Sequence, residues 1–144
     1  MGQARDVLDR VTTLAVDEHN LESALDLYAD DAVVQTPDAG EIRGRVDIED
    51  YWRQLLDGFP DSHFEPIAKH DTGRTAIDEG YLIGTNTAPI RLPSGETLPA
   101  TGRSVRLRGC DVATVENGRI IEHHLYFDQA EFLAQLGLAP DQQS

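Results

Sequence analysis

The clearest pattern along the chain is a pair of strand-like runs that meet at Asn117-Gly118. Both residues tolerate the positive φ of a two-residue type I′ turn, so Asn-Gly between β-prone runs is a strong hairpin signal. This loop fixes the predicted pairing: Glu116 with Arg119, Val115 with Ile120, Ala113 with Glu122, Asp111 with His124, Gly109 with Tyr126 and Leu107 with Asp128. A short amphipathic helix follows the hairpin.

In this register one face of the hairpin carries most of the polar chemistry, because directly opposed residues point to the same side of a sheet. The polar residues on this face are Asp111, Glu122, His124, Tyr126 and Asp128. Three carboxylates, an imidazole and a phenol among aliphatic side chains indicate either a solvated face or a functional cavity. A single β-bulge would exchange the two faces beyond it.

Three helices are predicted before the long strands, from apolar residues at helical spacing. The first covers residues 4–18, and the second is capped by Asn20. The apolar positions of the second are Leu21, Ala24, Leu25 and Tyr28, and those of the third are Ile48, Tyr51, Trp52, Leu55, Leu56 and Phe59. We expect Asp47 to cap the third helix and Gly58 with Pro60 to end it.

The remaining pattern is typical of strands. A short strand is expected at residues 32–36, and longer strands at 63–70 and 75–87, before a loop from Pro89 to Pro99. Helices first and a meandering sheet afterwards indicate an α+β fold, with the helices on one face of a largely antiparallel sheet. We expect one domain over residues 1–144, with a flexible tail at 139–144 whose residues 141–144 are polar.

The amino-acid composition excludes some classes of binding partner. With 26 acidic and 12 basic side chains the formal charge is −14, which repels nucleic acid and anionic lipid headgroups. The single Cys110 cannot form an intrachain disulfide, and the N-terminus lacks the apolar segment of an export signal. We therefore expect a cytoplasmic protein that binds neither nucleic acid nor membranes.

Several short motifs occur in a familiar order: YADDAVVQTP, GTNT at 84–87, LPATGRSV at 98–105, ENGRIIEHHLYFD and LAQLG. Together they resemble the SnoaL-like polyketide cyclase family over roughly residues 5–138. The resemblance implies the NTF2-like cone, a curved sheet wrapped around helices with one deep pocket, often in homodimers or higher oligomers. It also implies cofactor-free chemistry on a polyketide-like ligand, with Asp128 at the position of the family's acid–base aspartate.

The chain departs from the family pattern at three places. Many relatives read GTH where this chain reads Gly84-Thr85-Asn86, EHW where it reads 122–124, and H-x-P where it reads 35–37. A common pocket histidine is thus replaced by Asn86, an aromatic residue by His124, and the first residue of H-x-P by Gln35. The same cone also hosts ketosteroid isomerases, epoxide hydrolases, hydroxylation-associated proteins and binding modules, so fold alone does not assign activity.

An aldol cyclisation needs a base for an acidic C–H bond and a donor for the developing oxyanion. We expect Asp128 to be the base, His124 or Asn86 to be the donor, and Asp111 to orient His124. Alternatively, Asp128 with Glu131 forms the capping box of the last helix. The Asp111–His124 pair is then only a cross-strand contact.

The expected substrate-binding residues are Tyr28, Gln35, Trp52 and Tyr126, with the aromatic side chains serving as core and pocket wall together. No metal site is expected at His123-His124, since adjacent strand residues point to opposite faces. The leading hypothesis is a cofactor-independent cyclase or isomerase. The alternatives are a non-catalytic ligand-binding or scaffold protein, and a hydroxylation or epoxide-opening enzyme, although the sequence shows no convincing Asp-Arg-Asp arrangement.

Overall fold

The computed structural model describes residues 3–92 and 94–138. The predicted polar tail lies outside these residues. Helices and strands follow in this order: α1 (Gln3–Thr12), the π-helical turn η1 (Thr13–Asp17), α2 (Leu21–Leu25), β1 (Tyr28–Thr36), β2 (Gly40–Arg43), α3 (Arg45–Leu56), β3 (His63–Asp71), β4 (Thr75–Thr85), β5 (Ile90–Arg91), β6 (Thr97–Leu98), β7 (Ser104–Glu116), β8 (Arg119–Phe127) and α4 (Gln129–Gln135).

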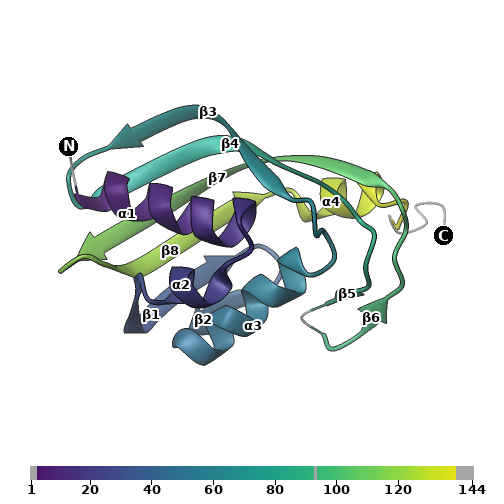
Figure 1. Cartoon of the computed structure of the whole chain (residues 1–144), viewed down its shortest axis with the longest axis horizontal. Coiled ribbons are helices and arrows are strands. Elements are labelled where there is room, and N and C mark those ends of the chain that lie inside the picture. The colour runs from purple at the N-terminus through teal and green to yellow at the C-terminus, as the bar shows by residue number, and fades with distance from the viewer. Residues whose placement is uncertain (1–2, 93, 139–144) are drawn as a thin grey trace.

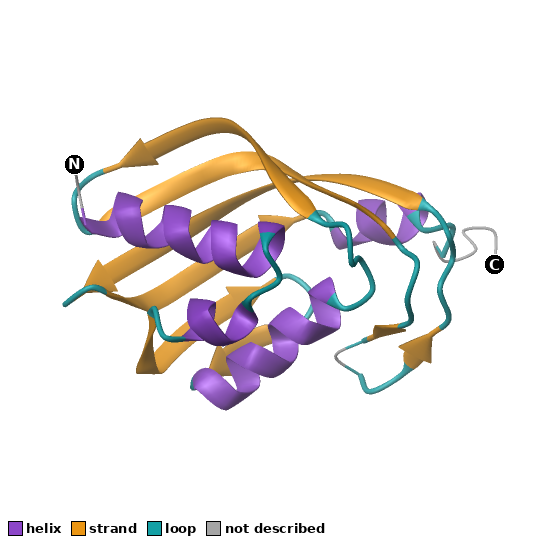
Figure 2. Cartoon of the chain, viewed as in Figure 1, coloured by secondary structure: helices purple, strands orange, loops and turns teal. Residues whose placement is uncertain are grey.

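Six strands form one curved sheet in the order β2-β1-β8-β7-β4-β3 (Figure 1). Neighbouring strands are antiparallel except β1 and β8, which are parallel. The short strands β5 and β6 pair separately, within the segment predicted as a loop. Helices α1, α2 and α3 lie on one face of the sheet, and α4 follows at one end (Figure 2). The predicted α+β class is confirmed.

The first two helices form largely as predicted. Apolar residues of α1 and η1, among them Leu8, Val11 and Ala15, are buried against the sheet. Asn20 caps α2, because its side chain accepts a hydrogen bond from the amide of Ser23. The predicted second helix was too long. Helix α2 ends at Leu25, and Tyr28 begins β1, whose backbone pairs with β8.

The third helix buries the predicted stripe, including Ile48, Tyr51, Trp52 and Leu56. Its N-cap is Gly44 and not Asp47, so that prediction was wrong. Gly44 has a φ of 84°, which a residue with a Cβ adopts at a cost, and its carbonyl accepts the first helical hydrogen bond from Ile48. Asp47 lies in the first turn, where a carboxylate interacts favourably with the helix dipole.

The C-terminal hairpin has the predicted turn but a different register. Asn117 and Gly118 both have positive φ, and Glu116 faces Arg119 as expected. A β-bulge between Thr114 and Val115 shifts every later pair. The observed pairs are Thr114 with Glu122, Ala113 with His123, Val112 with His124, Asp111 with Leu125, Cys110 with Tyr126 and Gly109 with Phe127. The predicted pairing of Asp111 with His124 was therefore wrong.

The side chains pack into two hydrophobic clusters. The larger one joins α1, η1, α2 and α3 to the inner face of the sheet, with Tyr28 and Ile120 fully buried at its centre. The smaller one packs α4 against β5 and β7 through residues such as Phe59 and Phe132, whose rings lie 5.9 Å apart. The two clusters fix the helices on the sheet.

Among the helices of residues 3–92 and 94–138, none has the length and hydrophobicity that a membrane span requires.

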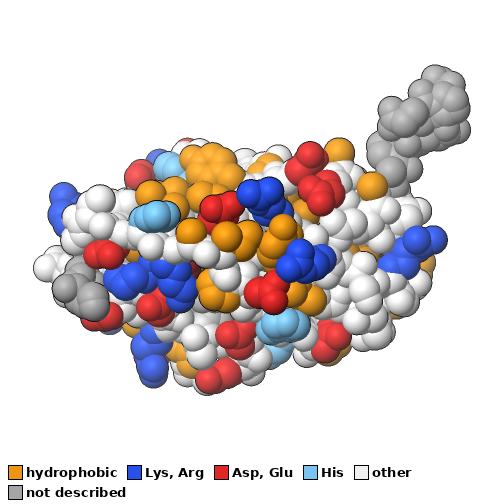
Figure 3. Space-filling view, turned by 90° about the horizontal axis from the view of Figure 1, so that it is seen from above, with side chains coloured by type: hydrophobic (Ala, Val, Ile, Leu, Met, Phe, Trp, Pro, Cys, Tyr) orange, Lys and Arg blue, Asp and Glu red, His pale blue; other side chains and the backbone are white. Residues whose placement is uncertain are grey.

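The outer face of the sheet, opposite the helices, mixes hydrophobic and charged side chains (Figure 3). Arg106 lies over the ring of Tyr81 at 3.7 Å and pairs with Glu65 at 2.7 Å. Arg108 pairs with Glu79 at 3.0 Å. Each of these ion pairs is exposed and contributes little to folding stability.

Replacing Ile120, which is fully buried, tests whether the hairpin is central to the larger cluster. We expect Ile120→Ala to lower the free energy of unfolding by roughly 2–5 kcal/mol, because it removes buried methyl groups and leaves a cavity. Urea denaturation followed by circular dichroism measures this loss. The control is Ile67→Ala on β3, where the isoleucine is 50% exposed and the loss should be much smaller. Equal losses would contradict the central role of β8.

Candidate active site

A cavity of about 100 Å³ lies between the helices and the inner face of the sheet. Helices α1 and α3, the turn η1 and strands β3, β4, β7 and β8 provide its walls. The apolar wall residues are Val11, Val16, Trp52, Leu55, Phe64, Leu82, Leu107, Leu125 and Phe127. Asp111 and His123 provide the carboxylate and the imidazole of the lining, and no Lys or Arg lines the cavity within the described residues.

Asp111 and His123 form a hydrogen-bonded pair in this apolar wall. The His123 Nε2 lies 2.6 Å from the Asp111 Oδ2. The histidine side chain is 1% exposed, whereas that of Asp111 is 18% exposed. The bulge in the hairpin explains the contact, because it turns His123 to the inner face on which Asp111 lies. We call these two residues the dyad.

A chain of buried hydrogen bonds fixes the histidine of the dyad. Trp52 Nε1, which can only donate, contacts the Tyr28 hydroxyl at 3.3 Å. The Tyr28 hydroxyl lies 2.7 Å from His123 Nδ1 and has one hydrogen to donate to it. In this arrangement Nδ1 accepts from Tyr28, and Nε2 donates to the carboxylate of Asp111.

Tyr28 remains a neutral donor in this position. Complete burial, with a smaller contribution from the Asp111 charge, raises the pKa of its phenol far above the ordinary value. Ionisation of Tyr28 therefore plays no part near neutral pH, and the phenol acts by holding the imidazole in one tautomer.

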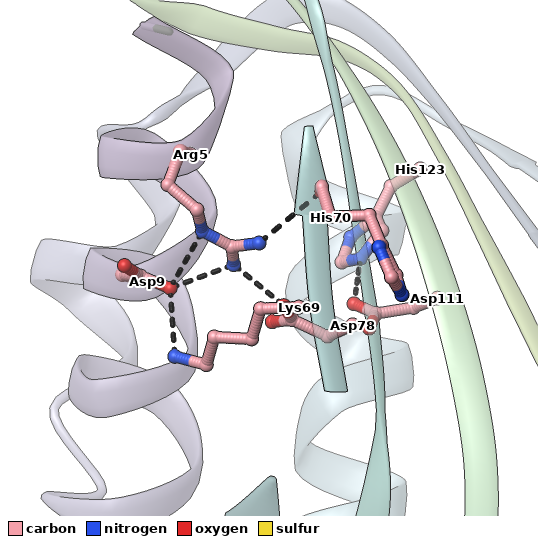
Figure 4. Close-up of polar contacts among 7 residues, drawn as sticks. All are labelled: Arg5, Asp9, Lys69, His70, Asp78, Asp111 and His123. Carbon is pink, nitrogen blue, oxygen red and sulfur yellow. Dashed lines mark hydrogen bonds and ion pairs between the residues drawn. The ribbon is translucent and has the colours of Figure 1, made fainter. Parts of the chain in front are cut away.

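A second carboxylate lies behind the dyad (Figure 4). Asp78 on β4 faces Asp111 across the strand pair and is 1% exposed. Arg5 of α1 reaches Asp78 Oδ1 at 2.5 Å and Asp9 Oδ1 at 2.6 Å. An Asp-Arg-Asp arrangement therefore exists, which the sequence analysis did not find, but none of these three residues lines the cavity.

Asp128 is the N-cap of α4. Its Oδ1 accepts a hydrogen bond of 3.1 Å from the Glu131 amide, and the side chain is exposed. It is not among the residues lining the cavity. Of the two readings of Asp128, the contacts support the cap and do not support the base.

His124 and Gln35 lie on the outer face of the sheet, directly opposite each other in the pairing of β8 with β1. Neither lines the cavity, so the structure does not support His124 as a donor to substrate or Gln35 as a binding residue. The bulge is again the physical reason, since it turns His124 outward. Of the predicted binding residues, Trp52 lines the cavity, and Tyr28 lies behind it through His123. Tyr126 borders the cavity, but its side chain is 55% exposed and its ring lies 6.4 Å from that of His124 on the outer face.

Asn86 is completely buried but is used by the backbone of the loop. Its Nδ2 donates to the carbonyls of Gly58 and Ala88, at 3.0 and 2.8 Å. Its Oδ1 accepts from the amide and the hydroxyl of Thr101, at 2.7 and 2.8 Å. All of its hydrogen-bonding capacity is used, and it does not line the cavity, so we do not assign it as an oxyanion donor.

His123 is the functional candidate that the sequence prediction placed on the wrong face. A hairpin register with one β-bulge, which would exchange the two faces beyond it, places His123 on the same face as Asp111. His123 and His124 do point to opposite faces, and within residues 3–92 and 94–138 no three His, Cys, Asp or Glu side chains are grouped to hold a metal ion.

Comparisons with known proteins agree with this architecture. The family model described as SnoaL-like domain matches residues 8–123. A comparison of the sequence with curated proteins gives no match.

Solved structures with the same fold include proteins named as candidate polyketide cyclases. IdmH from Streptomyces antibioticus is 28% identical, with a TM-score of 0.75 over 94% of this chain and 99% of that one. A SnoaL-like candidate from Jannaschia sp. CCS1 is 15% identical, with a TM-score of 0.78 over 98% of both chains. AclR from Streptomyces galilaeus, named as a candidate hydroxylase, is 19% identical, with a TM-score of 0.77 over 94% of this chain and 97% of that one. The last two similarities show the fold alone.

Removing the Asn86 side chain tests its role as the anchor of the loop. We expect Asn86→Ala to lower the free energy of unfolding by at least about 2 kcal/mol, because buried carbonyls and an amide lose their partners. Hydrogen exchange at the Thr101 amide should accelerate. Asn20→Ala is the control, since it removes an exposed N-cap worth about 1 kcal/mol. Unchanged exchange at Thr101 would contradict the anchor role.

Proposed function

Because the chain belongs to the SnoaL-like domain family, we propose that its apolar cavity is the active site of a cofactor-independent cyclase or isomerase. The substrate is a polyketide-like or other carbonyl compound with an acidic C–H bond. The observation that carries the proposal is the Asp111–His123 hydrogen bond of 2.6 Å in a mainly apolar cavity. A carboxylate sheltered from water and oriented by an imidazole is suited to proton abstraction.

In this proposal Asp111 is the general base. His123 binds Oδ2 and leaves Oδ1 for the substrate. Asp111 removes the proton α to a carbonyl, and the C–H electron pair becomes an enolate. In a cyclase the enolate carbon attacks a second carbonyl of the same molecule, and the resulting alkoxide takes the proton back from Asp111. In an isomerase the proton returns to another carbon.

His123 keeps the carboxylate in position throughout this cycle. Its Nε2 proton stabilises the ionised form of Asp111, and the contacts of Tyr28 and Trp52 hold the ring orientation. The oxyanion needs a donor of its own, and we assign this role to the hydroxyl of Thr12, which lines the cavity from α1.

The cavity favours a neutral substrate. Within the described residues no cationic side chain lines it, and the chain carries a formal charge of −14. An anionic ligand would lose hydration without gaining an ion pair. Neutral ketones and esters do not meet this penalty.

Two Asp→Asn substitutions separate the proposed base from the helix cap. We expect Asp111→Asn to reduce α-proton exchange by at least about 100-fold, because an amide cannot take the proton. Asp128→Asn should leave the exchange within about twofold, since Asn is as good an N-cap as Asp. The measurement is deuterium incorporation from D₂O into a panel of neutral 1,3-dicarbonyl esters, followed by NMR, with folding checked by circular dichroism.

The result also decides between the two positions. A loss on Asp128→Asn with full exchange in Asp111→Asn would overturn the assignment of the base.

A non-catalytic apolar-ligand protein is the second candidate function. The observation in its favour is the Asp128 contact with the Glu131 amide, which leaves the family's acid–base position as a helix cap. Under this alternative the same esters bind to the protein and broaden the cavity resonances of Leu125 and Phe127. Wild-type protein and Asp111→Asn would then show the same background exchange.

We also propose that the chain forms a homodimer or a higher homo-oligomer through the outer face of the sheet. The alternating pairs Glu65–Arg106 and Glu79–Arg108 support it, because two copies could exchange these ion pairs. Sedimentation equilibrium should give a mass of at least twice 15.9 kDa. Arg108→Glu should weaken the assembly at least tenfold, whereas Arg53→Glu on α3 should not. A monomeric wild-type protein would contradict this proposal.

A further inference from the structure

Asp78 has no role in the chemistry above, yet it is buried beside the dyad. It lies directly opposite Asp111 in the β4–β7 pairing, and both side chains point to the inner face. Asp78 is 1% exposed and Arg5 is 8% exposed. Two neighbouring carboxylates in a low-dielectric interior repel each other, so the arrangement costs free energy.

Arg5 compensates part of that cost. Its guanidinium bonds Asp78 at 2.5 Å, Asp9 at 2.6 Å and the carbonyl of His70 at 3.4 Å (Figure 4). Burial alone would lower the pKa of Arg5, but the hydrogen bonds to both carboxylates outweigh it and the pKa is raised. The guanidinium therefore stays charged and holds an anion at Asp78.

Folding stability alone does not account for this pair. A buried ion pair is often no more stabilising than apolar side chains of similar volume, because both charges lose hydration. An Arg5–Asp78 contact that only joined α1 to the sheet could be replaced by hydrophobic packing such as that of nearby Leu8 and Ala76. The position of Asp78 next to Asp111 suggests an electrostatic purpose.

We propose that Asp78 is a positioning residue that acts through Asp111: its carboxylate, held by Arg5, sets the charge balance of the Asp111–His123 dyad. The fixed negative charge favours the protonated form of the dyad, which helps Asp111 to take a proton from a weakly acidic C–H bond. The catalytic consequence rests on the proposed function, whereas the effect on the dyad does not.

The charged and titratable groups around the dyad come from five elements. They are Arg5 and Asp9 on α1, Tyr28 on β1, Lys69 and His70 on β3, Asp78 on β4, and Cys110 on β7. Glu79 of β4 points to the outer face, where it pairs with Arg108. Burial, followed by the charge of Asp111, raises the pKa of Asp78, and Arg5 opposes this. Lys69 contacts Asp9 at 3.0 Å. Of the acidic groups named, Asp78 is the one that pairs directly with Asp111 across the strands, and its ion pair with Arg5 favours the ionised carboxylate.

The test is the titration of the His123 ring in the full chain, followed by NMR of its ring C–H signals between pH 4 and 10. His123→Gln identifies these signals by their loss. We expect Asp78→Asn to move the midpoint about one pH unit lower, because the protonated ring loses a nearby negative charge. A role in folding alone would leave the midpoint unchanged.

Two further variants control for charge and for folding. Asp9→Asn removes the other carboxylate that contacts Arg5. The Asp9 side chain is 41% exposed, so this variant should leave the His123 midpoint unchanged. Should Asp78→Asn fail to fold, Arg5→Met with Asp78→Asn removes both charges and leaves no buried ion without a partner. The double variant should also shift the midpoint lower, because Asp78 is the nearer charge of the pair.

The inference is overturned if the His123 titration curve of a folded Asp78 variant is the same as that of the wild type. This includes the case in which neither curve shows a titration. An equal shift in Asp9→Asn overturns the inference as well. Neither result depends on substrate, so both differ from failure of the proposed function, which is full exchange activity in Asp111→Asn. With an active wild-type protein, the acidic limb of the exchange rate of Asp78→Asn should move to lower pH together with the His123 midpoint.

Discussion

A single extra residue in β8 determines which side chains reach the cavity. Side chains of a strand alternate between the two faces, so a bulge of one residue reverses every position beyond it. After the bulge, His123 lies inside and His124 outside. Without it, the imidazole beside Asp111 would come from another position, and the hydrogen bonds to Tyr28 and Trp52 could not form.

These hydrogen bonds make the buried polar chain specific. An unpaired polar group in an apolar interior costs more free energy than a paired one gains. Three hydrogen bonds link the four residues: Trp52 donates to Tyr28, Tyr28 to His123, and His123 to Asp111. The chain therefore favours one histidine tautomer and one ring orientation, and it joins α3 and β1 to the wall of the cavity.

The helices contribute more than a cover for the sheet. Helix α1 supplies Val11 and Thr12 to the cavity and Arg5 to the carboxylate behind it. Its continuation as a π-helical turn places Val16 in the same wall. A shift of this helix would change the volume of the cavity and the charge near the dyad together. The cone shared by this family thus offers several positions at which chemistry can be altered without changing the fold.

The sequence by itself determined the α+β class, the stripe of α3 and the Asn117-Gly118 turn, because each depends on residues close together in the chain. It left Asp128 open between base and helix cap, and the contacts of the structure support the cap. The site depended on contacts between distant segments. Sequence reasoning selected Asp111 and Trp52 as candidates, and the structure places both in the cavity wall. The role of Asn86 as a loop anchor and the burial of Asp78 by Arg5 follow from packing. A bulge costs little and leaves no unique local pattern, so only the tertiary structure decided that His123, and not His124, meets Asp111.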